Sequence, residues 1–200
     1  MLRNLVAPLV TRLRRRWERT LHPWRRQATL ALLGRHRMPR GVLFVCHGNI
    51  LRSPYAAAAF RARLGPEATN VIRVDSAGFI GPTRPAPRAA VEEAASRGLD
   101  LREHRSRTLT AGALRNADIV AVMEPEQMRA VAQLFRTRAS IIVLGDLDPI
   151  PDGGRVITDP VDQPRAVFAA SYDRIDRCVT VLAEALAGQR PGLRRVAPPA

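Results

Sequence analysis

Short apolar, β-rich runs alternate with helix-like segments through most of the chain. The runs predict strands at residues 41–46, 71–75, 118–123 and 140–145. The segments between and after them predict helices over 53–65, 88–97, 125–135 and 165–187. Strands that alternate with helices form a parallel sheet covered on both faces. We therefore expect an α/β fold with three layers and a parallel central sheet over residues 41–188, followed by a Pro- and Arg-containing tail over 189–200.

The first helix of this domain has marked ends. Ser53 is a residue type that caps helix N-termini, and Pro54 suits the first helical position. Gly65 is the expected end of this helix, and Gly98 is the expected end of the next one. The loop between the first strand and Ser53 is therefore short.

Residues 1–40 form a basic, amphipathic extension. Apolar residues recur at three- and four-residue spacing, and Arg mostly takes the other positions; the apolar set is Leu2, Leu5, Val6, Leu9, Val10, Leu13, Trp17, Leu21 and Trp24. The segment is too short in apolar residues to span a bilayer, and Pro8 together with the lack of a cleavage site argues against a secretory signal. Two interpretations remain: a helix on an anionic membrane surface, or an extension that packs on its own domain or is partly disordered.

Composition and charge indicate the class of the protein, its partners and its cellular location. The 200 residues are 46% apolar, enough for one core, and the net charge is +14. Residues 1–40 account for +10 of it, with eleven Arg against Glu18 alone. No nucleic-acid recognition motif accompanies this charge, so we expect no nucleic-acid partner. The two cysteines, Cys46 and Cys178, form neither a disulfide framework nor a metal-binding pair. We expect a cytoplasmic protein, peripheral on the inner membrane face if the extension binds lipid, without a cofactor or metal.

The stretch VLFVCHGNILRSP, residues 42–54, concentrates the candidate chemistry. Cys46 ends the first predicted strand, and sites in parallel sheets lie at the carboxyl ends of strands. Arg52 follows after five residues, directly before the helix start. Backbone N–H groups of such a loop, with the helix N-terminus, form an anion site that also favours a thiolate. The expected lining is His47, Gly48, Asn49, Ile50, Leu51 and Ser53, in which Gly48 and Asn49 tolerate a positive φ.

Arg52 can bind two oxygens of a phosphoryl group at once. A thiolate below a phosphoryl group held in this way is a nucleophile in position.

The loop and five further motifs resemble the low-molecular-weight protein tyrosine phosphatases. The motifs are VDSAGF (74–79), PAPRAAVEEAASRGLDL (85–101), HRSRTLT (104–110), ADIVAVME (117–124) and TDP (158–160). The resemblance implies that Cys46 attacks phosphorus through a phosphocysteine intermediate, that Arg52 binds the phosphoryl group and that Ser53 hydrogen-bonds the thiolate. It also implies that Asn49 shapes the loop and that His104 supports it from below.

The resemblance further implies an Asp-Pro loop that supplies the general acid and base. Two pairs are present, Asp148-Pro149 and Asp159-Pro160. The family places a Phe nine residues after its Asp and a Tyr four further on, and only Asp159 reproduces this, with Phe168 and Tyr172. We therefore assign the role to Asp159. The remaining acids of the region are expected to be solvated loop residues or turn formers: Asp148, Asp152 and Asp162.

Four positions depart from the family pattern. Leu51 replaces a second Cys, Ala57 replaces a Glu, Val161 replaces an aromatic, and Phe79 follows SAG in place of a small or polar residue. The expected substrate is a phosphorylated protein or a small phosphomonoester, of which phosphotyrosine is one. Two alternatives remain: an arsenate reductase that uses an external thiol, and a protein that binds a phospho-ligand without catalysis.

Overall fold

A four-stranded parallel sheet forms the centre of the protein. The computed structural model describes residues 3–36, 39–151 and 154–187, with the side chains of 3–15 and 65–69 outside that description. The strands lie in the order β2-β1-β3-β4, with bounds β1 Gly41–Cys46, β2 Arg73–Gly78, β3 Ile119–Val122 and β4 Ser140–Val143. All neighbouring pairs are parallel. The predicted tail over 189–200 lies outside the described residues.

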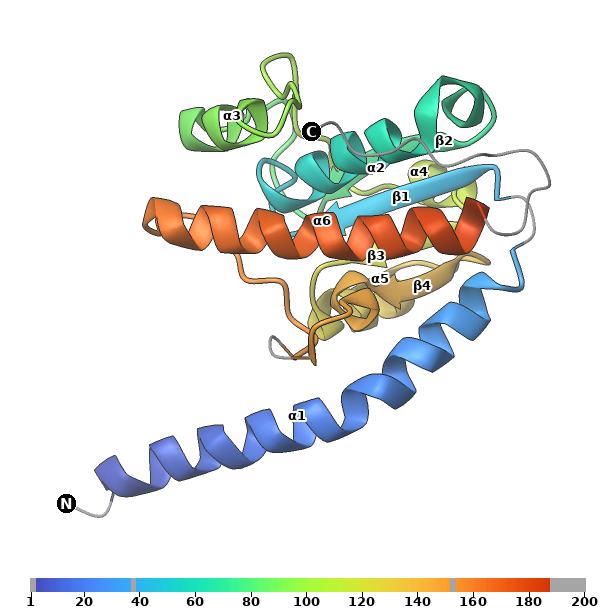
Figure 1. The fold of residues 1–200 in the computed structure, drawn as a ribbon. Coiled ribbons are helices and arrows are strands. Elements are labelled where there is room, and N and C mark those ends of the chain that lie inside the picture. The colour runs from blue at the N-terminus through green and yellow to red at the C-terminus, as the bar shows by residue number, and fades with distance from the viewer. Residues whose placement is uncertain (1–2, 37–38, 152–153, 188–200) are drawn as a thin grey trace.

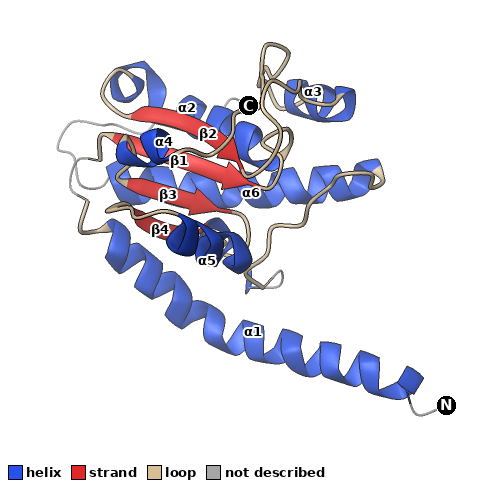
Figure 2. Ribbon diagram, turned by 180° about the vertical axis from the view of Figure 1, so that it is seen from behind, coloured by secondary structure: helices blue, strands red, loops and turns tan. Residues whose placement is uncertain are grey.

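Helices cover both faces of the sheet. Helices α2 (Arg52–Thr69) and α6 (Arg165–Ala187) lie on one face, and α4 (Ala111–Arg115) and α5 (Pro125–Leu134) lie on the other (Figures 1 and 2). Helix α3 (Arg88–Ala95) packs near α6, and the 3₁₀ helix η1 (Leu144–Leu147) follows β4 directly. This arrangement confirms the predicted three-layer α/β fold.

Strand β1 shows how the two layers of core are filled. Successive side chains of a strand point to opposite faces. Val42, Phe44 and Cys46 belong to the core beneath α2 and α6, whereas Leu43 and Val45 belong to the core on the α5 side. All six residues of β1 are buried, as expected for a central parallel strand. Cys46 therefore ends β1 on the face that α2 covers.

Helix α1 (Arg3–Leu33) runs past the β4 edge of the sheet. Its second half packs against η1, β4 and α6, and buries His22, Thr29 and Leu33. Its first turns project beyond the domain (Figures 1 and 2). Packing on its own domain therefore holds for the second half of the extension. Within the described residues, no helix is long and apolar enough to cross a membrane.

Several predicted boundaries were wrong. Gly65 does not end the first helix, because α2 begins at Arg52 and continues to Thr69. Ser53 thus lies inside the first turn. A helical glycine costs about 1 kcal/mol relative to alanine, which the packing of α2 on α6 and β2 offsets. Gly98, with φ of 74°, does lie in the turn that follows α3.

The strand predicted at 71–75 is β2, which pairs residue by residue with all of β1 and so occupies 73–78. Helix α4 was not predicted; Thr110 caps it by accepting a hydrogen bond from Ala113 N.

Candidate active site

The sulfur of Cys46 lies at the centre of the loop that joins β1 to α2. The backbone N–H of Asn49 donates to Sγ at 3.2 Å, and Ser53 Oγ lies 3.0 Å from Sγ. Ser53 Oγ already accepts a hydrogen bond from Asn49 Nδ2 at 2.9 Å, so its own hydrogen is available to the sulfur. The alternative acceptor of that hydrogen, Ala77 O, lies farther away, at 3.4 Å. Two donors directed at one sulfur stabilise a thiolate.

Asn49 gives the loop its shape. Its φ of 51° is in the left-handed region, which Asn tolerates better than most residues. Its Oδ1 accepts from Arg107 N at 2.8 Å, and its carbonyl oxygen lies 2.7 Å from His104 Nε2. Gly78 lies directly beside it: a Cβ there would be 2.8 Å from Asn49 N. Every polar group of Asn49 is thus used to fix the curl.

His104 supports the loop from behind. A carbonyl oxygen only accepts hydrogen bonds, so His104 carries its hydrogen on Nε2. Burial lowers the pKa of His104, and the nearby Arg107 and Arg105 lower it too, although the hydrogen bond to Asn49 acts the other way. The ring is therefore neutral at neutral pH, which agrees with a supporting role.

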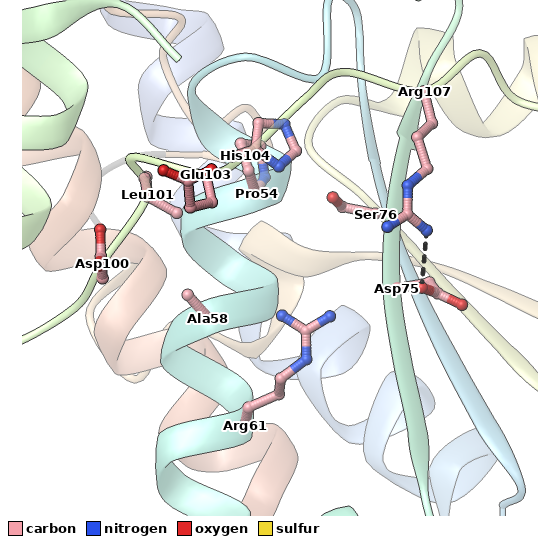
Figure 3. A pocket seen from close by; sticks show the side chains of 10 residues that line it. All are labelled: Pro54, Ala58, Arg61, Asp75, Ser76, Asp100, Leu101, Glu103, His104 and Arg107. Atoms are coloured by element: carbon pink, nitrogen blue, oxygen red, sulfur yellow. Dashed lines mark hydrogen bonds and ion pairs between the residues drawn. The ribbon is translucent and has the colours of Figure 1, made fainter. Parts of the chain in front are cut away.

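A cavity of about 270 Å³ has His104 in its lining. Figure 3 shows His104 next to Pro54, with Leu101 and Asp100 on one side of them and the Arg107–Asp75 ion pair on the other. The Arg61 guanidinium points toward the space between His104 and Asp75. Neither Cys46 nor Arg52 lines this cavity. The cavity thus borders His104, which supports the loop, and does not include the sulfur of Cys46.

Arg52 is 1% exposed and makes contact with two acids. Its Nη1 donates to Glu124 Oε1 at 2.5 Å and to Ile157 O at 3.0 Å, and its Nη2 forms an ion pair with Asp159. Its buried Nε has no hydrogen-bond partner among the residues that the structure describes. The structure therefore brings Arg52 and Asp159 together at the carboxyl edge of the sheet, and leaves one donor of the guanidinium unused.

Two contacts of the site were missed from the sequence. Glu124 lies two residues after the end of β3, accepts a hydrogen bond from Arg52, and is held by Gln127 Nε2 at 2.9 Å. A carboxylate next to the carboxyl end of a buried parallel strand is the sequence signal that marks such a residue. Arg84 donates to Gly48 O at 2.8 Å from a loop, and no sequence pattern marks it.

Asp148 corrects one expectation. It was predicted to be a solvated acid or a turn former. Its Oδ1 does accept a hydrogen bond from Ile150 N at 3.1 Å, as in a turn. Its side chain is buried instead of solvated, however, and accepts hydrogen bonds from Arg174 and Arg177 of α6. Asp162 does behave as a turn former, because it is exposed and has a φ of 54°. Asp152 lies outside the described residues.

Phe168 and Tyr172, whose spacing from Asp159 favoured it over Asp148 as the general acid, are buried in the core near the loop. The Tyr172 ring stacks on Tyr55 with centroids 3.7 Å apart, and Phe168 contacts it edge-on. Burial raises the pKa of Tyr172 well above its ordinary value.

The positions that depart from the family pattern differ in exposure. Ala57 is buried, Phe79 is half-buried against the α5-side core, and Val161 is exposed. Val161 alone among these lies at the surface beside Asp159.

Comparison with known proteins decides the family. The sequence profile described as "Low molecular weight phosphotyrosine protein phosphatase" matches residues 41–191. The chain belongs to this family. Among curated relatives of these phosphatases, the probable low molecular weight protein-tyrosine-phosphatase EpsP of Ralstonia nicotianae is 32% identical over 143 residues, which cover 71% of this chain and 92% of EpsP.

Solved structures agree on the phosphatase fold. The tyrosine phosphatase Wzb from Escherichia coli K30, crystallised with sulphate, superimposes with a TM-score of 0.66 at 25% identity, covering 74% of this chain and 99% of Wzb. The YwlE arginine phosphatase from Geobacillus stearothermophilus gives a TM-score of 0.62 at 26% identity, covering 75% and 94%. The protein is thus a hydrolase of the tyrosine phosphatase type, and residues 1–40 precede the part that the family shares.

Proposed function

We propose that this phosphatase hydrolyses phosphotyrosine or a related phosphomonoester through a phosphocysteine on Cys46, with Arg52 binding the phosphoryl group and Asp159 as general acid and base. The observation that carries the proposal is the convergence of three groups. A sulfur that receives two donors lies in a loop whose end bears a buried guanidinium with an unused Nε, and that guanidinium contacts Asp159. A tetrahedral dianion fits this set of donors.

The reaction follows from these groups. The phosphoryl oxygens take over Arg52 Nη2, and the Asp159 carboxylate released from this ion pair takes up a proton from the solvent. Cys46 Sγ attacks phosphorus, a P–S bond forms, and the bond to the leaving oxygen breaks while Asp159 donates its proton to that oxygen. Asp159, now a carboxylate, then takes a proton from water as the water oxygen attacks phosphorus. The P–S bond breaks, and inorganic phosphate leaves with the thiolate restored.

Cysteine variants test the nucleophile. Cys46→Ser is expected to abolish hydrolysis of an aryl phosphate while the protein stays folded, because a serine hydroxyl is far less ionised than a thiol. Cys178→Ser is the matched control, since Cys178 is a residue of α6 whose side chain is buried in the core. Phosphate release and a denaturation curve are measured for both. Turnover retained by Cys46→Ser would remove Cys46 from the mechanism.

An acid variant tests Asp159. Asp159→Ala is expected to slow hydrolysis of phosphotyrosine by roughly 10²- to 10⁴-fold, because its leaving oxygen needs a proton. A nitrophenyl phosphate, whose phenolate leaves unaided, is expected to lose much less. If Asp148→Ala produced this dependence on the leaving group instead, the choice between the two Asp-Pro pairs would be wrong.

The substrate is tested with matched phosphopeptides. Because Val161 stands where the family pattern has an aromatic, stacking on a substrate ring is reduced at this rim. One structural neighbour is named an arginine phosphatase, so phosphotyrosine and phosphoarginine versions of one peptide are compared by kcat/KM. Faster release from the phosphotyrosine peptide supports the proposal. Thiol-dependent arsenate reduction without release of phosphate from any ester would contradict it.

We also propose that α1 attaches this phosphatase to an anionic membrane surface. Trp17, Leu21 and Trp24 follow one another at four- and three-residue spacing and are exposed, the two tryptophans by 65% and 73%. The face that packs on the domain carries His22 and Leu33 instead, so the apolar stripe stays uncovered in the described part of the helix. The sequence repeats the same spacing toward its start, amid eleven Arg, which suits anionic headgroups.

Vesicle co-sedimentation tests the attachment. Full-length protein is expected to pellet with vesicles containing anionic lipid and to be released by salt. Trp17→Ser with Trp24→Ser should reduce pelleting strongly. Leu134→Ser is the matched control, because Leu134 is an equally exposed apolar residue on α5. Equal pelleting of the tryptophan variant and the control, or none with anionic lipid, would refute the attachment.

A further inference from the structure

The segment between η1 and Asp159 is tied together by one arginine of α6. Arg174 Nε donates to Asp148 Oδ2 at 2.9 Å, at the start of the segment. Its Nη1 donates to Val156 O at 2.6 Å and its Nη2 to Gly154 O at 2.5 Å, near the end. One guanidinium therefore fixes the distance between the two ends of the segment that carries Asp159, which we call the acid loop (the described residues 148–151 and 154–159).

The acid loop leads from this anchor straight into the site. Ile157 N donates to Met123 O at 3.0 Å, and Ile157 O accepts from Arg52 Nη1 at 3.0 Å. Thr158 O accepts from Ser171 Oγ at 2.9 Å. Asp159 follows directly and pairs with Arg52. A displacement at the start of the acid loop therefore acts on the residues that flank Asp159.

Helix α1 supplies a further anchor. The backbone carbonyl of Asp148 accepts a hydrogen bond from His22 Nε2 at 2.7 Å, and both residues are buried. The carbonyl only accepts, so Nε2 carries the hydrogen. His22 comes from residues that precede the segment matched by the family. The acid loop is thus held partly by a helix that the shared phosphatase fold does not provide.

We propose that His22 is a positioning residue for the general acid, acting through Asp148 and Arg174 on the acid loop. The proposal rests on the proposed role of Asp159. Proton transfer to a leaving oxygen needs the carboxyl within about 2.6–3.2 Å of it, and a shift of about 1 Å lowers rates steeply. Loss of the His22 bond leaves a buried carbonyl without its donor, so the start of the acid loop moves toward another partner.

The expected signature is a rate loss that depends on the leaving group. His22→Ala is expected to lower kcat for phenyl phosphate about tenfold, less than removal of the acid itself, with a much smaller loss for a nitrophenyl phosphate. His22→Gln is expected to recover most of the loss, because its amide N–H can donate to the same carbonyl. A general loss of folded protein would lower both rates equally and would not be rescued.

Full-length variants test the proposal against a reference and a control. Asp159→Ala is the reference, and Thr20→Ala is the matched control, since Thr20 is exposed on α1 and its hydroxyl donates to Arg16 O of the same helix. Absence of leaving-group dependence in Asp159→Ala would refute the role of Asp159 itself. If that dependence is present in Asp159→Ala and absent in His22→Ala, or if His22→Gln fails to recover it, the positioning role of His22 is overturned.

Discussion

Replacement of Asp148 by Asn tests the energetics of the acid-loop anchor. The substitution keeps the shape of a side chain that is 1% exposed and removes its charge. The carboxylate accepts from Arg174 Nε at 2.9 Å, from Arg177 Nε at 2.8 Å and from Arg177 Nη2 at 2.9 Å. An amide has one oxygen to accept these bonds, and its NH₂ group would oppose a guanidinium. The buried Arg174 then loses its charged partner.

The expected loss of stability is about 3 kcal/mol. Breaking a buried ion pair on one side costs about 3–5 kcal/mol, and the lower end applies because Arg177 is one-third exposed and keeps some contact with water. The measurement is denaturant unfolding at neutral pH, and we expect the slope of the unfolding free energy against denaturant concentration to stay unchanged. Asp162→Asn, an exposed turn residue, is the control and should stay within about 0.5 kcal/mol of the parent. A loss below about 1 kcal/mol in Asp148→Asn would refute the reasoning.

The difference in unfolding free energy between the parent and Asp148→Asn has a defined pH dependence. Burial acts to raise the pKa of Asp148, but the hydrogen bonds from Arg177 and Ile150 N and the charges of Arg177 and Arg174 outweigh it, so the pKa lies below its ordinary value. A carboxyl whose pKa is lower in the folded than in the unfolded protein stabilises the fold at pH values above its unfolded pKa of about 3.9. This contribution is lost as the pH falls toward the folded pKa. The difference between parent and Asp148→Asn should therefore be constant from pH 7 to about 5 and shrink below about pH 4. A difference that grows on acidification contradicts the assignment.

Three further outcomes follow from the loop and the core. Gly78→Ala is expected to lower kcat at least tenfold, because its Cβ would lie 2.8 Å from both Asn49 N and His47 O and displace the loop; unchanged kcat would mean that the curl tolerates movement. Arg52→Lys is expected to lose most activity without loss of fold, since the planar fork is gone, and near-normal rates would remove Arg52 from phosphoryl binding. Because burial raises the pKa of Cys178 far above neutrality, iodoacetate at pH 7 should not label it, which mass spectrometry checks; rapid labelling of Cys178 would contradict its burial.

The sequence predicted the parts of the site that depend on local spacing. The strand–loop–helix that places Cys46, Asn49 and Arg52 is encoded within a dozen residues, so the loop follows once the strand and helix are recognised. The choice of Asp159 over Asp148 depended on the family resemblance, and the structure places Asp159 on Arg52. The catalytic roles of these residues stay predictions until variants are measured.

What the sequence did not predict depends on distant packing. The burial of Asp148 is set by two arginines that lie 26 and 29 positions later, and a lone Asp-Pro pair carries no sign of them. Gly65 is a helix-ending residue type whose effect is overridden by the contacts of α2 with α6. The two interpretations of residues 1–40 were not exclusive, because a helix has two faces: one carries Leu33 into the core, and the other leaves Trp24 exposed.

Helix α1 is synthesised well before the part of the domain on which it packs. His22 reaches its partner, Asp148, across a separation of 126 residues. At about 5–20 residues per second, a ribosome needs roughly 6–25 s to make that stretch, and α6 follows later still. Throughout that time the residues of α1 have been synthesised while their docking site on the domain has not. The proposed membrane attachment through the tryptophan face does not need the domain and can therefore form before the acid loop has been synthesised, whereas docking on the domain needs Asp148 and comes later.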